Sequence, residues 1–313
     1  MKDQFGREIS YLRLSITERC TLRCVYCRSE EGLCPKAAEL TADQLIEVTR
    51  ACAELGVNKV RVTGGEPLLR RDLIEIVAGI RAIPEIKDVS LTTNAQDLAN
   101  QAAGLKTAGL DRINISMDSL DPDKFERMTN GNLMKVLEGI EKAIEVGLAP
   151  IKINCVLIKG TNDDEVRDFI EFTRDHPIDV RFIEYMPIGN DSEKVGINNQ
   201  DILAAFPELE PVLSRYAGQP SRDYQIKGYQ GRVGLISPIS RRFCIDCNRI
   251  RMMSDGTLRA CLGQESEVCL RPALDQGHEA IRDLIEKTIY NKPRGHNFGR
   301  EHLNQRNMSR IGG

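Results

Sequence analysis

The chain has 313 residues, of which 41% are hydrophobic and 28% charged, and its net charge is −3. This is the composition of an ordinary globular protein, and it gives no reason to expect binding to nucleic acid or to a membrane surface. No apolar run reaches transmembrane length, and the N-terminus lacks the apolar core of a signal peptide. The ten cysteines are clustered, which indicates metal ligation in a reducing cytoplasm rather than a secreted disulfide framework.

Strand-like and helix-like segments alternate along the first part of the chain. The pattern predicts strands over residues 9–16, 57–63, 89–93, 111–116, 151–158 and 180–185. It predicts helices over residues 41–55, 71–82, 97–108, 131–146 and 162–175, the first with Thr41 as N-cap and Gly56 at its end. Such alternation favours the α/β class, with a parallel sheet curled into a full or partial barrel. The chemistry of these barrels sits at the C-terminal ends of the strands.

The alternation stops near residue 187. Residues 187–240 are rich in Gly, Pro, Asn and Ser and hold shorter strand-like pieces, such as residues 231–236. A helix at about 278–290 and a polar tail follow. We therefore expect two units, a barrel over residues 1–187 and a distinct C-terminal region over residues 188–313.

Three cysteines lie close together in the loop after the first predicted strand. Cys20, Cys24 and Cys27 have the spacing C-x3-C-x2-C. A [4Fe–4S] cluster normally takes four cysteines, so this group would leave one iron open to a small molecule. A zinc site with a distant fourth ligand is one alternative, although zinc sites usually contain paired C-x2-C units. Packing of buried thiols is another, and the flanking Arg19 and Arg23 disfavour it.

A second cysteine group lies near the C-terminus. Cys244, Cys247 and Cys261 have the spacing C-x2-C-x13-C, and a turn at residues 254–256 predicts a hairpin that returns Cys261 to the side of Cys244. The spacing fits a second three-cysteine cluster and equally a zinc site completed by Cys269. The remaining cysteines are isolated and are interpreted as packing residues: Cys34, Cys52 and Cys155.

Polar and apolar side chains alternate along several of the predicted strands, whereas buried parallel strands are usually apolar on both faces. If helices cover the Val, Ile and Leu faces, the interior carries a set of cations: Arg13, Lys59, Arg61, Lys152 and Arg181. Because unpaired buried cations are costly, they require an anion, and a polyphosphate suits both kinds of side chain. An antiparallel sheet with one solvated face would show the same alternation, but the strand–helix rhythm disfavours it.

Several motifs carry a family resemblance. The first cysteine group with an aromatic residue before its last member, followed by Gly-Gly-Glu-Pro at residues 64–67, resembles the radical S-adenosylmethionine (SAM) superfamily. Within it, the chain resembles the GTP 3′,8-cyclases of molybdenum cofactor biosynthesis at residues 92–94, 114–118, 181–187, 244–261 and 312–313. These motifs are collinear with the family and span nearly the whole chain.

The resemblance implies an incomplete (β/α)6 barrel of the TIM type, with two [4Fe–4S] clusters and SAM as cofactors. Cys20, Cys24 and Cys27 would hold the first cluster, whose open iron chelates SAM, and Cys244, Cys247 and Cys261 would hold the second. Reductive cleavage of SAM would give a 5′-deoxyadenosyl radical that takes H3′ from GTP, after which C3′ adds to guanine C8. The product would be 3′,8-cyclo-7,8-dihydroguanosine triphosphate, made by a lyase in the first step of molybdopterin synthesis.

The resemblance also assigns roles to individual residues. The SAM site would be lined by Tyr26, Gly65, Ser116 and Met186. The GTP contacts would be Arg13, Lys59, Arg61, Thr92, Lys152, Arg181, Arg249 and Arg251. The tail residues that would reach the active site and take part in catalysis are Arg310, Gly312 and Gly313. Glycine fits a narrow channel because it has no side chain, although a disordered end is the ordinary alternative.

A few positions depart from the family pattern. Arg28 stands where many members carry Met-Pro, Ala95 stands where Gly is usual, and Cys34 is extra. None of them is a ligand position. The expected partners are GTP as substrate, a low-potential electron donor and functional coupling to cyclic pyranopterin monophosphate synthase, for a monomer or homodimer.

Two other functions remain as alternatives. A peptide-modifying radical SAM enzyme would usually carry more C-terminal cysteines than this chain has. A non-enzymatic zinc or electron-transfer protein would need neither the Gly-Gly-Glu-Pro motif at residues 64–67 nor the interior cations.

Overall fold

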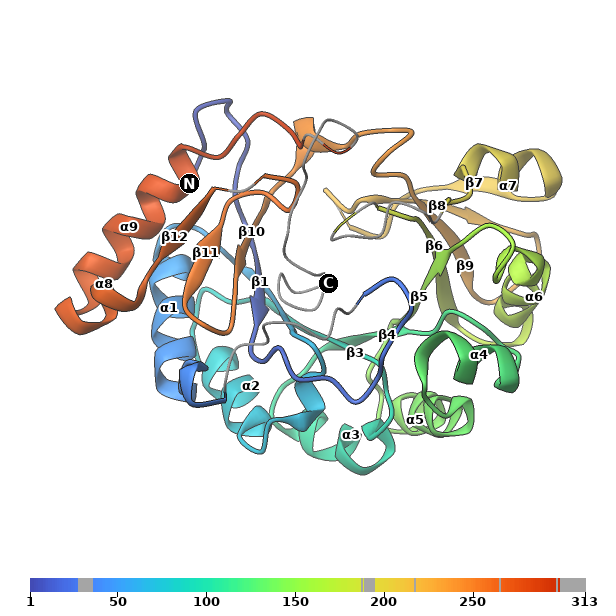
Figure 1. Cartoon of the computed structure of the whole chain (residues 1–313), viewed down its shortest axis with the longest axis horizontal. Helices are drawn as coiled ribbons and strands as arrows, with labels where there is room; N and C mark the ends of the chain where they lie inside the picture. Colours follow the sequence, from blue (N-terminus) through green and yellow to red (C-terminus); the bar gives the residue numbers. More distant parts are fainter. Residues whose placement is uncertain are drawn as a thin grey trace.

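The computed structural model describes residues 1–27, 36–186, 188, 195–216, 218–264, 266–296 and 298. Within these ranges, twelve strands form one sheet in the order β12-β11-β10-β1-β2-β3-β4-β5-β6-β9-β8-β7. The sheet curves around a central space, and helices α1 to α6 lie on its outer side (Figure 1). None of the helices in the described ranges is long and apolar enough to cross a membrane.

Six parallel strands form the middle of the sheet. They are β1 (Tyr11–Ser15), β2 (Lys59–Thr63), β3 (Asp88–Thr93), β4 (Arg112–Ser116), β5 (Ile151–Leu157) and β6 (Ile178–Glu184), each paired with the next. The helices between them are α1 (Ala42–Glu54), α2 (Leu73–Arg81), α3 (Leu98–Thr107), α4 (Pro122–Thr129), α5 (Leu133–Glu145) and α6 (Val166–Asp175). The predicted partial barrel is confirmed.

The two faces of these strands differ as the alternation predicts. Leu12 pairs with Val60 in the register of β1 and β2, and both are fully buried beneath the helices. Arg13 pairs with Arg61 in the same register and points the other way, because side chains alternate along a strand. The sequence therefore builds an apolar outer face for the helices and a polar inner one.

The strands that follow residue 187 extend the same sheet at both edges. They are β7 (Glu210–Val212), β8 (Ser221–Gln225), β9 (Arg232–Ile236), β10 (Arg249–Met252), β11 (Thr257–Arg259) and β12 (Glu267–Cys269). β10 pairs in parallel with β1, and β9 pairs in parallel with β6. The predicted hairpin is present as the antiparallel pair of β10 and β11. The division into two units at residue 187 stays a prediction.

Three helices escaped the sequence-based prediction: α4, α7 (Asn199–Ala205) and α8 (Arg271–Gln276). All are short, so each offers only about two turns over which a helical pattern could be recognised. α4 has local signals nonetheless, because the Asp121 side chain accepts a hydrogen bond from the backbone N–H of Lys124 at 2.7 Å and Asn130 ends the helix with φ +57°. The predicted C-terminal helix is α9 (His278–Tyr290), which packs against α1 and α8.

Candidate active site

A cavity of about 340 Å³ lies inside the curve of the sheet. It extends from Tyr11 and Lys59, at the starts of β1 and β2, to the loops that follow the strands. Two groups of cysteines border it: the first trio (Cys20, Cys24 and Cys27) and the second trio (Cys244, Cys247 and Cys261). Residues more than two hundred positions apart in the sequence thus share one chamber.

The first trio lies in the loop after β1. The backbone N–H of Cys27 donates to the carbonyl of Cys24 at 3.0 Å, and Asn94, after β3, donates from Nδ2 to the Cys20 sulfur at 3.6 Å. Burial, the carboxylate of Asp118 and the other two thiols hold the pKa of Cys24 well above its usual range. The three sulfur atoms are therefore near enough to act on one another.

The loop after β2 is packed against the first trio's loop. Gly65 donates its N–H to the carbonyl of Thr17 at 2.7 Å, and a Cβ at Gly65 would lie only 2.3 Å from the carbonyl oxygen of Arg19. The next residue, Glu66, is buried and accepts from the Thr93 hydroxyl at 2.6 Å and the Asn94 N–H at 2.7 Å. Glycine is required here because the two loops approach so closely.

The second trio is assembled from two elements. Cys244 opens the 3-10 helix Cys244–Asp246, Cys247 follows it, and Cys261 lies just after β11. The backbone N–H of Cys247 donates to the carbonyl of Cys244 at 3.2 Å. Burial raises the pKa of Cys247, but the cations of Arg249 and Lys292 outweigh it and lower the pKa to about 6.

Each trio brings three thiols to the cavity, the ligand type of the iron–sulfur clusters expected from the sequence. In the described ranges, no three Cys, His, Asp or Glu side chains are grouped so that they could hold one ion. The thiolates of a cluster bind different irons and stand further apart than four ligands around one zinc. Cys269 is exposed on β12 and does not line the cavity, so it gives the second trio no fourth ligand there.

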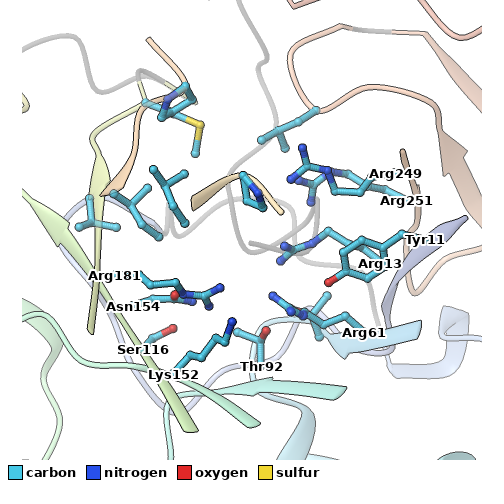
Figure 2. A pocket seen from close by; sticks show the side chains of 18 of the residues that line it. Tyr11, Arg13, Arg61, Thr92, Ser116, Lys152, Asn154, Arg181, Arg249 and Arg251 are labelled. Carbon is cyan, nitrogen blue, oxygen red and sulfur yellow. The ribbon is translucent and has the colours of Figure 1, made fainter. Parts of the chain in front are cut away.

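Cations from β1, β2, β5, β6 and β10 line the cavity, and the labelled ones converge on its centre (Figure 2). They are Arg13, Lys59, Arg61, Lys152, Arg181, Arg249 and Arg251. Burial, followed by the neighbouring cation Arg181, lowers the pKa of Lys152 to about 7. Burial, followed by Arg61, lowers the pKa of Arg181 to about 9. The buried carboxylate of Asp179 lies 3.9 Å from Lys152 but is also bound by Arg215 at 2.9 Å. The wall thus carries an excess of positive charge.

Several buried polar atoms on this wall have no hydrogen-bond partner within the described part of the chain. They are the Tyr11 hydroxyl, Asn154 Oδ1 and Arg181 Nε. Other groups are oriented, since Arg181 donates from Nη2 to Asn114 Oδ1 at 3.0 Å and Arg61 donates from Nε to Ser90 Oγ at 3.3 Å. Because buried polar groups are normally hydrogen-bonded, this wall is built for a polar, anionic ligand.

Sequence reasoning missed two residues of this wall. Arg112 lies two positions before Asn114 on β4, and the same alternation that predicted the other cations would have found it. Tyr216 lies outside any regular element, and no pattern marks it. Its ring centre is 4.8 Å from the Arg112 guanidinium carbon and 4.9 Å from Lys152 Nζ, a cation–π arrangement over both cations.

The other residues named from the sequence line the cavity, lie in the core or fall outside the described residues. The cavity is also lined by Tyr26, Gly65, Thr92, Ser116 and Met186. Cys52 and Cys155 are fully buried in the core, as expected of packing residues. The positions that fall outside the described residues are Arg28, Cys34, Arg310, Gly312 and Gly313. Ala95 has φ +60°, in the left-handed region that favours glycine.

Comparison with known proteins agrees with this geometry. Residues 14–173 match the Radical SAM superfamily, and residues 178–298 match Molybdenum Cofactor Synthesis C. The GTP 3′,8-cyclase of Listeria monocytogenes serotype 4b is 47% identical over 100% of this chain and 99% of its own length. That of Alkaliphilus oremlandii is 46% identical over 100% of both chains.

Two solved structures share the fold at low sequence identity. Streptococcus suis SuiB bound to S-adenosylmethionine has a TM-score of 0.61 and 15% identity, over 91% of this chain and 64% of that one, slightly under two thirds of its length. Native anSMEcpe with bound AdoMet has a TM-score of 0.56 and 16% identity, over 93% and 82% of the two chains. The chain is 46–47% identical to these cyclases over its full length, and both of its cysteine trios border one cavity. It therefore belongs to the GTP 3′,8-cyclase family of the radical SAM superfamily.

Proposed function

We propose that the protein is a radical SAM GTP 3′,8-cyclase. It converts GTP to (8S)-3′,8-cyclo-7,8-dihydroguanosine 5′-triphosphate, the first step of molybdopterin biosynthesis, and acts as a lyase. The observation that carries the proposal is the single cavity bordered by both cysteine trios and by a wall of cations. Full-length similarity to curated GTP 3′,8-cyclases supports it.

The first trio would hold a [4Fe–4S] cluster whose open iron binds SAM. Bound there, the cluster and SAM would supply one low-potential electron and the radical chemistry needed to remove H3′ from GTP. The protein's part is to orient the bound molecule through the residues around the trio: Tyr26, Gly65, Ser116 and Met186. Because Gly65 has no side chain, the loops that follow β1 and β2 can approach each other closely at this point.

The cations opposite would bind the triphosphate. We assign contacts with GTP as a whole to Arg13, Lys59, Arg61, Thr92, Lys152, Arg181, Arg249 and Arg251. Guanidinium groups bind phosphate oxygens in pairs, and an ammonium adds a point charge. Binding would neutralise the neighbouring positive charge that adds to burial in lowering the pKa values of Lys152 and Arg181. The triphosphate would thereby fix the ribose at one distance from the first trio.

The second trio would hold another [4Fe–4S] cluster, with its open iron toward the guanine base. Arg249 and Arg251 lie on β10, between Cys247 and Cys261 in the chain, and line the same cavity. Anchoring GTP at the triphosphate and at the base leaves the ribose between the two trios. Such fixed placement is the main contribution a protein makes to a radical reaction within one substrate.

The proposed function also includes the C-terminal tail and two partners. Arg310, Gly312 and Gly313 would take part from the tail. A low-potential electron donor would reduce the first cluster, and the product would pass to cyclic pyranopterin monophosphate synthase, in a cytoplasmic monomer or homodimer.

The test is anaerobic reconstitution with iron and sulfide, reduction with dithionite, and incubation with SAM and GTP. The expected result is formation of 5′-deoxyadenosine together with loss of GTP. ATP serves as the matched control, because it carries the same triphosphate without guanine and is expected to remain intact. A reduced protein that cleaves SAM while GTP stays unchanged contradicts the proposal.

A further inference from the structure

A buried lysine joins the two segments that carry the second trio. Lys292, two residues after α9, is 2% exposed. Its ammonium donates to the backbone carbonyl of Arg249 at 2.8 Å and to the carbonyl of Ala260. Ala260 directly precedes Cys261, and Arg249 is two residues after Cys247. One side chain therefore fixes the backbone beside two of the three cysteines.

Within the described ranges, no carboxylate is paired with the Lys292 ammonium. Among the residues that the structure describes, its ion-pair and hydrogen-bond partners are the two carbonyl groups alone. The charged groups that act on it are the thiols of Cys247 and Cys261 and the cations of Arg7 and Arg249. Burying an ammonium group without an anion is costly. Its counter-charge therefore comes from the second trio itself.

Arg7 reinforces the same arrangement from the N-terminal end of the chain. It is paired with Asp3 at 2.6 Å and donates from Nη1 to the carbonyl of Cys244 at 2.9 Å. It also donates to the backbone carbonyls of Arg294 at 3.0 Å, Pro293 at 2.7 Å and Lys292 at 3.5 Å. Arg7 thus ties the third cysteine to the segment that contains Lys292.

The two trios differ in the sign of the charges that act on their thiols. Among the groups that shift the pKa of Cys24 in the first trio, the largest after burial is the carboxylate of Asp118. In the second trio, the groups that lower the pKa of Cys247 are instead cations, first Arg249 and then Lys292, and Lys292 is hydrogen-bonded to carbonyls between the cysteines. A cluster gains negative charge on reduction, so a buried cation stabilises its reduced form and raises its reduction potential.

We propose that Lys292 is a positioning residue that supplies buried positive charge to the second cluster and raises its reduction potential, with Arg7 holding the segment in place. The inference rests on the proposed function, because it requires a cluster on the second trio. It adds a role for a residue that neither ligates the cluster nor contacts the reacting atoms of GTP.

The test compares Lys292→Met, which keeps the length of the side chain and removes its charge, with Lys287→Met as a matched control. Lys287 is exposed on the same terminal turns of α9, so its loss removes equal charge without touching the trio. Each protein is reconstituted without GTP, its iron is counted, and both clusters are followed by electron paramagnetic resonance during a reductive titration. Added SAM identifies the first cluster, because only that signal responds to it.

In Lys292→Met the second cluster is expected to have a more negative potential than in wild type, with the first unchanged. Selective loss of the second cluster, leaving about four irons and the SAM-responsive signal, supports the proposal if Lys292→Arg retains that cluster, and overturns it if Lys292→Arg loses the cluster as well. Lys287→Met should match wild type, and Lys292→Arg should restore the potential in part. About eight irons with wild-type potentials in Lys292→Met would overturn the proposal.

If Lys292→Met does not fold, Lys292→Arg decides: retention of both clusters supports a role for the charge, and loss of both shows that the site requires only the shape of lysine. If the wild-type protein itself binds only about four irons, the proposed function is at fault rather than the role of Lys292.

Discussion

Tyr26 donates its hydroxyl to Asp118 Oδ2 at 2.7 Å and thereby joins the loop of the first trio to the end of β4. The other oxygen of Asp118 accepts from the backbone N–H of Val156 at 2.8 Å, and its carbonyl accepts from Asn162 Nδ2 at 2.7 Å. The loop is therefore anchored to two neighbouring strands by buried hydrogen bonds. Burial raises the pKa of Asp118 to about 6, so the carboxylate depends on these donors.

Tyr26→Phe should loosen the loop of the first trio, because one oxygen of a buried carboxylate loses its donor. An unsatisfied buried group costs about 1–3 kcal/mol. We expect a lower unfolding temperature and weaker SAM binding, measured by thermal denaturation and equilibrium binding to the reconstituted protein. Tyr290→Phe is the control, since Tyr290 is 55% exposed. Equal stability and SAM affinity in Tyr26→Phe and wild type would show that the hydrogen bond has no such role.

Arg61→Ala should weaken GTP binding by roughly 10- to 100-fold, the range for a lost hydrogen bond to a charged group. SAM cleavage without cyclisation should persist, because Arg61 lies on β2 and not in the loop of the first trio. The measurement is the GTP dissociation constant together with the yield of 5′-deoxyadenosine. Arg50→Ala removes a cation from the exposed face of α1 and should change neither quantity. Unchanged GTP affinity in Arg61→Ala would count against the cation wall as the triphosphate site.

Cys261→Ala should reduce the bound iron from about eight to about four per chain, because one of the two clusters loses a ligand. Cys269→Ala should retain about eight, since Cys269 is exposed and away from the cavity. Iron and zinc are measured after anaerobic reconstitution. If the wild-type protein contains zinc and both variants lose it, the result would instead favour a zinc site formed by the second trio and Cys269.

GTP binding should take up a proton at about pH 8 through Lys152. The pKa of Lys152 is lowered to about 7, so much of the unliganded protein carries the neutral amine above that pH. A bound triphosphate favours the ammonium, and affinity should therefore fall as the pH rises past about 7. Calorimetry in buffers of different ionisation enthalpy measures the uptake. Lys152→Met should abolish most of it, and an uptake that survives this change would assign the proton to another group.

The stability of the fold depends on pH through Lys152 in the opposite direction from GTP affinity. Without GTP, the unfolded chain keeps the Lys152 proton up to its ordinary pKa, whereas the folded chain loses it near 7. The contribution of this residue to stability therefore rises with pH between those two values.

Much of the barrel could be predicted because its signals are local. Thr41 caps α1 as expected, where it forms a capping box with Gln44, and strands such as β2 alternate Arg61 with valines as a polar inner face requires. The neighbours of β1 and β6 could not be predicted, since pairing with β10 and β9 joins segments separated by long stretches of chain. No local pattern records such contacts.

The site shows the same division. The trios follow from spacing alone, and Arg112 was within reach of the alternation that identified Arg61. Tyr216 and Lys292 were not, because each is placed by tertiary contacts: Tyr216 over two cations, and Lys292 against two distant carbonyls.

The central claim is that the cavity holds GTP with its ribose facing the first trio. The most direct measurement uses GTP carrying deuterium at C3′, incubated with SAM and the reduced, reconstituted protein. Mass spectrometry of the 5′-deoxyadenosine is expected to show one transferred deuterium, formed together with the cyclised product. If 5′-deoxyadenosine forms without deuterium while GTP is intact, the ribose does not face the first trio and the account is contradicted.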